Sequence, residues 1–120
     1  MVSKTWVPER GDIIWIDFNP QVGREMKDIH PLLVLSPKAF NDKTRIVIGL
    51  PMTTAESNES NPFAVKFVGD KGKVSYILAH QPKSFDWRLR AAKPHPWKKM
   101  PDEILSLAGE LLNQIITISG

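Results

Sequence analysis

Proline and glycine interrupt this chain so often that only short elements fit between them. The 120 residues include ten prolines and seven glycines, and the apolar runs that they separate have the length of β-strands. The runs lie at residues 13–18, 31–35, 45–50, 63–68 and 74–79, with a possible further strand at 84–88. Five or six short strands separated by turns predict a small β-barrel or sandwich, built by residues up to about 90.

The C-terminal part follows a different period. Ile104, Ala108, Leu111 and Ile115 recur at helical spacing, and Pro101 suits the first turn of a helix. We therefore expect one amphipathic helix from about Pro101, which closes the core or covers a sheet edge. The fold class is mainly β with a C-terminal helix, in a single domain over residues 1–120.

The composition and the missing motifs argue against several classes of function. The chain has no cysteine, so thiolate chemistry and cysteine metal sites are excluded, and a reducing cytoplasm is expected. It has no apolar run of membrane-spanning length, and its N-terminus does not suggest a signal peptide. The sequence motifs of P-loop NTPases, zincins and α/β-hydrolases are missing. A net charge of +3 favours an anionic partner only mildly.

The segment from Gln21 to His30 concentrates ionisable groups between two predicted strands. Its five ionisable residues are Arg24, Glu25, Lys27, Asp28 and His30. One interpretation is a solvated hairpin loop. The other is a site for a phosphodiester, because cleavage of RNA by its own 2′-hydroxyl needs a base, an acid and a cation near the phosphate.

Two further strand ends carry polar side chains. Thr53 and Thr54 follow the third apolar run, and their hydroxyls suit phosphate oxygens, although threonines at strand ends are common. His80, Gln81 and Lys83 follow the fifth run, where amide and lysine groups suit base edges or phosphate. For a lone histidine, a surface or packed polar role is the more frequent alternative.

Aromatic residues lie next to basic ones in the last third of the chain. Trp87, beside Arg88 and Arg90, suits either base stacking or the core. The run at residues 95–99, with one histidine, one tryptophan and two lysines, suits either RNA contact or a solvated loop before the helix.

An ordered set of segments resembles the MazF/PemK toxin family over nearly the whole chain. These segments are VPERGDIIWIDFNPQVGRE, HPLLVLSPKAFNDKT, PMTT and QPKSFDWRLRAA, followed by the helix. The resemblance implies a small SH3-like barrel, shared with a related gyrase-poisoning toxin family, and a homodimer. It also implies cleavage of single-stranded RNA or mRNA without a metal or other cofactor, leaving 2′,3′-cyclic phosphate and 5′-hydroxyl ends. A small MazE/PemI-like antitoxin, with a disordered tail across the dimer, is the implied partner.

The resemblance also transfers roles to individual positions. Glu25 matches a glutamate of the family's loop, and Thr53 matches the threonine that works with a catalytic arginine. Arg24 lies where relatives carry serine or histidine. The positions associated with RNA recognition in some members are Asn41, Gln81 and Lys83. We expect one RNA-binding groove to be lined by Arg24, Lys27, Gln81 and Lys83.

Two positions depart from the family pattern. His30 replaces the catalytic arginine, and His80 stands where several members have an aspartate. Arginine is a permanent bidentate cation, whereas histidine titrates near pH 6.5. Three outcomes follow: His30 and His80 act as an acid–base pair with Arg24 as the cation; the site is weakened or inactive toward RNA; or the chain has another substrate or a mainly regulatory role. The alternative functions are a non-catalytic protein that binds antitoxin or nucleic acid, and a gyrase-targeting toxin.

Overall fold

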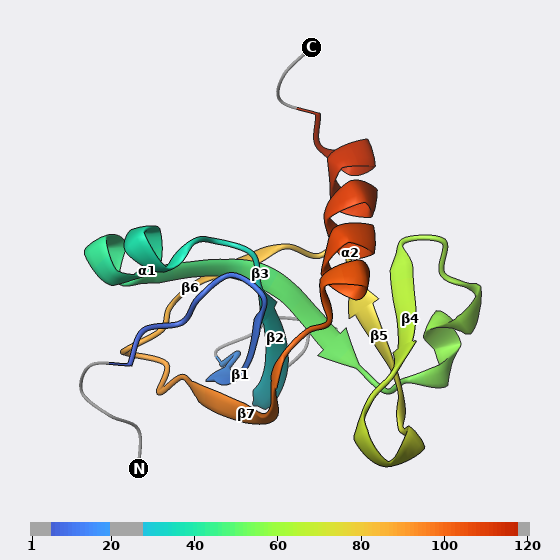
Figure 1. The fold of residues 1–120 in the computed structure, drawn as a ribbon, viewed down its shortest axis with the longest axis horizontal. Helices are drawn as coiled ribbons and strands as arrows, with labels where there is room; N and C mark the ends of the chain where they lie inside the picture. Colours follow the sequence, from blue (N-terminus) through green and yellow to red (C-terminus); the bar gives the residue numbers. More distant parts are fainter. Residues whose placement is uncertain (1–5, 20–27, 118–120) are drawn as a thin grey trace.

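The computed structural model describes residues 6–19 and 28–117, which form one curled sheet flanked by helices (Figure 1). The strands among these residues are β1 (Asp12–Asp17), β2 (Ile29–Val34), β3 (Ile46–Thr53), β4 (Ala64–Val68), β5 (Val74–Leu78), β6 (Lys83–Asp86) and β7 (Lys93–Lys99). The helices are α1 (Lys38–Thr44) and α2 (Asp102–Ile115), with short 3₁₀ turns η1 (Glu56–Ser60) and η2 (Asp70–Gly72). The strand order is β4-β5-β3-β2-β1-β7, with β6 paired to β3.

The sheet curls so that both of its faces are covered. Ile13 packs into one buried cluster with Met52, Ile77 and Ala108. The next residue, Ile14, packs into a second cluster with Phe18, Phe85 and Trp87 on the other face. Because successive side chains of a strand point to opposite faces, β1 contributes to both clusters. The prediction of a small β fold with a C-terminal helix is confirmed.

Strand β3 continues through a proline that we expected to end it. On one edge, residues 46–49 pair with β6, whereas Met52 and Thr53 pair with β5. Pro51 lies between these two pairings, where the strand changes partners and a missing N–H group breaks no ladder bond. The strand therefore runs on to Thr53.

Strand β7 and helix α1 were not expected from the sequence. Pro94 and Pro96 lie inside β7, and proline in a run argues against a central strand. The strand forms because it is the edge of the sheet and pairs only with β1 along the path. Lys99 adds an ion pair with Asp12 of β1, with 2.9 Å between Nζ and Oδ1. The prediction that the barrel ends near residue 90 is therefore wrong by one strand.

Helix α2 stands beside β4 and covers one end of the sheet (Figure 1). Ala108 is fully buried, and Ile104, Leu105, Leu111 and Leu112 pack against the first buried cluster. The helix begins at Asp102, as the period and Pro101 predicted. No helix in the described part of the chain is long and apolar enough to cross a membrane.

Candidate functional site

His30 lies in a position that holds its backbone extended. It is the second residue of β2, pairs with Ile16 of β1 and precedes Pro31, which disfavours helical backbone. Its ring meets Phe18 edge-on, with 5.6 Å between the ring centroids, and the side chain is partly buried. The strand pairing and the Phe18 contact thus fix this histidine at the start of β2.

The ends of the β1–β2 connection are joined immediately before His30. The amide of Asp28 donates to Asn19 Oδ1 at 3.1 Å, and Asn19 Nδ2 donates back to Asp28 Oδ1 at 3.1 Å. Phe18 N also donates to the Asp28 carbonyl. Arg24, Glu25 and Lys27 lie between these ends and outside the described residues, so their predicted roles stay predictions.

Thr53 ends β3 close to the start of β2. The pairing of β2 with β3 ends at Leu32 and Pro51, so His30 and Thr53 each lie two residues beyond that end. Both side chains line one pocket. Thr53 Oγ1 accepts the amide of Ala55 at 3.2 Å, which leaves the hydroxyl proton for another acceptor.

His30 and Thr53 line one pocket with residues from three other parts of the chain. Its volume is about 250 Å³. The lining residues are Trp15, His30, Pro31, Met52, Thr53, Thr54, Lys73, Ser75, His95 and Trp97. Lys73 is exposed, so the pocket has a cation at its rim and a largely aromatic wall.

The aromatic wall is centred on His95, which is 8% exposed. Its ring lies 4.5 Å from Trp15 and 4.9 Å from Trp97, measured between centroids. The amide of Trp97 donates to His95 Nδ1 at 3.1 Å. In the neutral ring the proton is therefore on Nε2.

The Trp97 indole occupies space that a side chain at position 69 would fill. A Cβ atom on Gly69 would lie 2.3 Å from Cη2 of Trp97. The indole also meets Phe67 edge-on at 6.0 Å. Trp97 lines a second cavity of about 460 Å³ as well.

Glu59, which lines a neighbouring cavity, has a structural role. Both oxygens of Glu59 are hydrogen-bonded, to Lys66 Nζ at 2.8 Å and to the Tyr76 hydroxyl at 2.5 Å. The bond from Lys66, and then that from Tyr76, holds the pKa of Glu59 below its ordinary value, while the bond to Glu59 raises the pKa of Tyr76. Glu59 is therefore a poor general base. Among residues 6–19 and 28–117, no three His, Cys, Asp or Glu side chains form a group suited to a metal ion.

The structure does not bring His80, Gln81 and Lys83 into this pocket. Tyr76 pairs with Thr53, and His80 lies four residues beyond Tyr76, on the order of 10 Å further along the chain direction. His80 contacts Phe63 at 6.0 Å and lies 3.3 Å from Gln81, measured between Nε2 atoms. Lys83 pairs with Gly49, four residues before Thr53. His80 is therefore not placed as the acid–base partner of His30.

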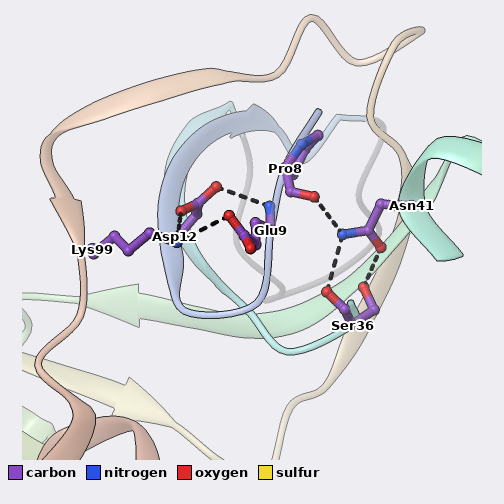
Figure 2. A network of polar contacts seen from close by, with 6 residues as sticks. All are labelled: Pro8, Glu9, Asp12, Ser36, Asn41 and Lys99. Atoms are coloured by element: carbon purple, nitrogen blue, oxygen red, sulfur yellow. Dashed lines mark hydrogen bonds and ion pairs between the residues drawn. The ribbon is translucent and has the colours of Figure 1, made fainter. Parts of the chain in front are cut away.

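Asn41 is a structural residue, which corrects its prediction as an RNA contact. Its side chain is 0% exposed. Its amide donates to the carbonyls of Pro8 at 2.8 Å and Ser36 at 3.0 Å, and its Oδ1 accepts the Ser36 hydroxyl at 2.5 Å (Figure 2). The protein's own groups thus use this side chain fully, and RNA cannot reach it.

Trp87 belongs to the core, and the partly buried Arg90 is engaged by the chain's own groups. Trp87 is 5% exposed, and its indole donates to the carbonyl of Asn41 at 2.8 Å. Arg90 lies over the ring of Phe85 and donates to the carbonyls of Asp17 and Asn19. Of the two interpretations open for Trp87, the structure selects the core.

The sequence did not identify Lys73, Trp15 and the His95–Trp97 pair as neighbours of His30. Nothing in the sequence marks Lys73 as a site residue, and the run at residues 95–99 suits both RNA contact and a solvated loop. The alternation Pro94-His95-Pro96-Trp97 does place His95 and Trp97 on one face of a strand. Pro94 and Pro96 argue against a strand, so this alternation alone does not predict one.

The chain is similar to curated endoribonucleases and to solved toxin structures. Residues 9–116 match the family described as PemK-like, MazF-like toxin of type II toxin–antitoxin system. The endoribonuclease toxin MazF of Escherichia coli K12 is 41% identical over 92 residues, 77% of this chain and 79% of that protein. Endoribonuclease PemK of Escherichia coli is 29% identical over 112 residues, 92% of this chain and 80% of that protein.

The crystal structure of MazF from Deinococcus radiodurans has a TM-score of 0.82 and 31% identity, covering 94% of this chain and 99% of that one. A MazE–MazF structure from the same organism has a TM-score of 0.80 and 32% identity, with 95% and 99% covered. The match over residues 9–116 and the shared barrel show that this chain belongs to the PemK/MazF-like toxin family of type II toxin–antitoxin systems.

Proposed function

We propose that this chain is the toxin of a type II toxin–antitoxin pair and cleaves single-stranded RNA or mRNA. The proposal rests on one observation, the convergence of His30 and Thr53 on a pocket that also contains Lys73 and His95. These residues supply an acid–base group, a hydroxyl donor and a cation around a space large enough for part of a nucleotide. The endoribonuclease relatives support this choice of reaction class.

The reaction that fits these groups is attack by the RNA's own 2′-hydroxyl. The neutral ring of His30 accepts the 2′-hydroxyl proton while the 2′-oxygen bonds to phosphorus. The bond from phosphorus to the 5′-oxygen breaks, and that oxygen takes up a proton from solvent water and leaves as a hydroxyl. His30 then returns its proton to the solvent. The products are a 2′,3′-cyclic phosphate and a 5′-hydroxyl.

The phosphate gains negative charge on its non-bridging oxygens in the transition state. The Thr53 hydroxyl and the Lys73 ammonium both line the pocket, and we propose that they donate to those oxygens. Lys73 is a point cation on a flexible stem, so it replaces the charge of the family's arginine but not its bidentate geometry. We therefore propose that His30 supplies proton transfer and Lys73 supplies charge.

Partners are proposed from the relatives. Solved structures of the Deinococcus radiodurans relative include MazE–MazF complexes, and this chain covers 99% of the MazF chain there. We propose a MazE/PemI-like antitoxin, a homodimer and a cytoplasmic site of action for this chain as well.

Incubation of the purified chain with a long single-stranded RNA in EDTA tests the function. We expect discrete fragments that end in 2′,3′-cyclic phosphate and 5′-hydroxyl groups, and no cleavage of a DNA strand of the same sequence, which lacks the nucleophile. Fragments with 3′-hydroxyl ends would contradict the mechanism. Intact RNA would contradict the activity itself, and tight antitoxin binding by the same sample would then indicate a binding protein.

A further inference from the structure

The aromatic wall of the pocket has a chemical character that proton transfer does not require. Trp15, His95 and Trp97 come from the two strands at one edge of the sheet and contact one another through their rings. Trp15 and Trp97 are partly exposed, although Trp97 also packs against the first buried cluster. Exposed aromatic faces beside a cation are the arrangement that single-stranded nucleic-acid sites use to stack bases.

We propose that this pocket binds one nucleobase of the RNA, next to the phosphate that is cleaved, and thereby sets the base preference of cleavage. The inference rests on the proposed function. The base stacks on the indoles of Trp15 and Trp97, and Lys73 and Thr53 stay on the phosphate that is cleaved. Ser75, which also lines the pocket, carries a further hydroxyl for a base edge.

The size of the pocket favours a single base over a longer occupant. Pockets for drug-sized ligands enclose roughly 300–1,000 Å³. A volume of about 250 Å³ lies just below that range and suits one planar ring system. His30 and Thr53 line the same space, so a base held there leaves its own phosphate beside the groups proposed to act on it.

The rigidity of the wall supports selectivity between bases. Trp97 packs edge-on against Phe67 and lies so close to the backbone of Gly69 that a Cβ atom there would clash with its ring. His95 accepts the Trp97 amide, so the histidine and the tryptophan are joined through the backbone as well as through their rings. A pocket with fixed walls discriminates by shape, because a base that does not fit cannot be accommodated by movement of the indole.

Nitrogen–proton NMR correlation spectra give a direct readout, because the chain has four tryptophans and each gives one indole signal. The probe is a mixed-sequence DNA hexanucleotide, which cannot undergo 2′-hydroxyl attack. We expect the signals of Trp15 and Trp97 to shift on titration. Those of Trp6 and Trp87, which meet each other edge-on at 5.9 Å in the second cluster, should stay unchanged as internal controls.

Two variants test whether the aromatic wall contributes to binding. Trp97→Leu should weaken binding of the hexanucleotide by about 5- to 150-fold, the range for loss of one base–aromatic stack. Gly69→Ala should weaken binding without removing any aromatic ring, since its new methyl group displaces the indole. Gly109→Ala is the matched control, because a Cβ atom there meets nothing within 4 Å.

Cleavage of a randomised RNA pool gives the second readout. Trp97→Leu and Gly69→Ala should change the base preference at one position beside the cut, whereas Gly109→Ala should reproduce the parent pattern. If the parent chain leaves RNA intact but the two indole signals shift, the proposed catalysis fails and the base site stands. Unshifted indole signals, or an unchanged base preference in active Trp97→Leu, would overturn the base site. A shift caused only by an antitoxin-derived acidic peptide would overturn it in favour of a protein partner.

Discussion

Replacement of Asn41 by alanine distinguishes a structural side chain from an RNA contact. The change removes three hydrogen bonds in a site that is 0% exposed. Ser36 Oγ keeps its partners on Ile48, at 2.9 Å and 3.4 Å. The carbonyls of Pro8 and Ser36 lose the Asn41 amide.

The expected cost follows from these contacts. Three net hydrogen bonds at about 1 kcal/mol each, with some penalty for the buried carbonyls left unsatisfied, give about 3–5 kcal/mol. That is a large share of the roughly 5–15 kcal/mol that stabilises a domain of ordinary size. Asn41 is also the one buried residue of the seven-residue helix α1, which is too short to be stable alone. The midpoint of thermal unfolding should fall by roughly 12–20 °C.

Urea unfolding followed by tryptophan fluorescence measures this loss. Asn41→Asp, which keeps the shape but removes the two donors, should also destabilise the fold. Asn113→Ala, on the exposed side of α2, is the control and should stay within about 0.5 kcal/mol of the parent. A stable Asn41→Ala chain with weakened RNA binding would refute the structural role and restore the prediction from the family resemblance.

Three further predictions concern the site and its surroundings. His30→Ala should lower the cleavage rate about 10²-fold or more. The pH–rate profile of the parent should bend between about pH 5 and 8, where histidine changes charge. A large gain in cleavage rate in His30→Arg would show instead that the natural histidine attenuates the enzyme. Because the folded chain lowers the pKa of Glu59, mainly through Lys66, its contribution to stability is present above the ordinary value of 4.5 and disappears as the pH falls. Urea midpoints at pH 7 and pH 3 should therefore differ less for Glu59→Gln than for the parent, and an equal difference would contradict this role. Gly49→Ala should destabilise the fold by about 1–3 kcal/mol, because its Cβ atom would lie 2.3 Å from the Leu33 carbonyl oxygen. A urea midpoint equal to that of Gly109→Ala would show that the strands can move apart without loss of stability.

Local patterns in the sequence were sufficient for most of the elements. The apolar runs at residues 13–18 and 31–35 became β1 and β2, and the helical period from Pro101 became α2. Such signals are local, because side-chain alternation and proline positions act over a few residues. The same patterns failed at residues 93–99, where prolines argue against a strand unless a sheet edge is available.

The sequence by itself determined that this chain is a small β fold with one covering helix, and that polar groups gather at strand ends. Only the tertiary structure decided which of those groups meet: His30 and Thr53 share a pocket with His95, whereas His80 lies elsewhere and Asn41 is buried. The physical reason is that the site is assembled by strand pairing. The pairings β1–β2, β2–β3 and β1–β7 bring distant segments together, and their register depends on the packing of the whole sheet rather than on any local run of residues.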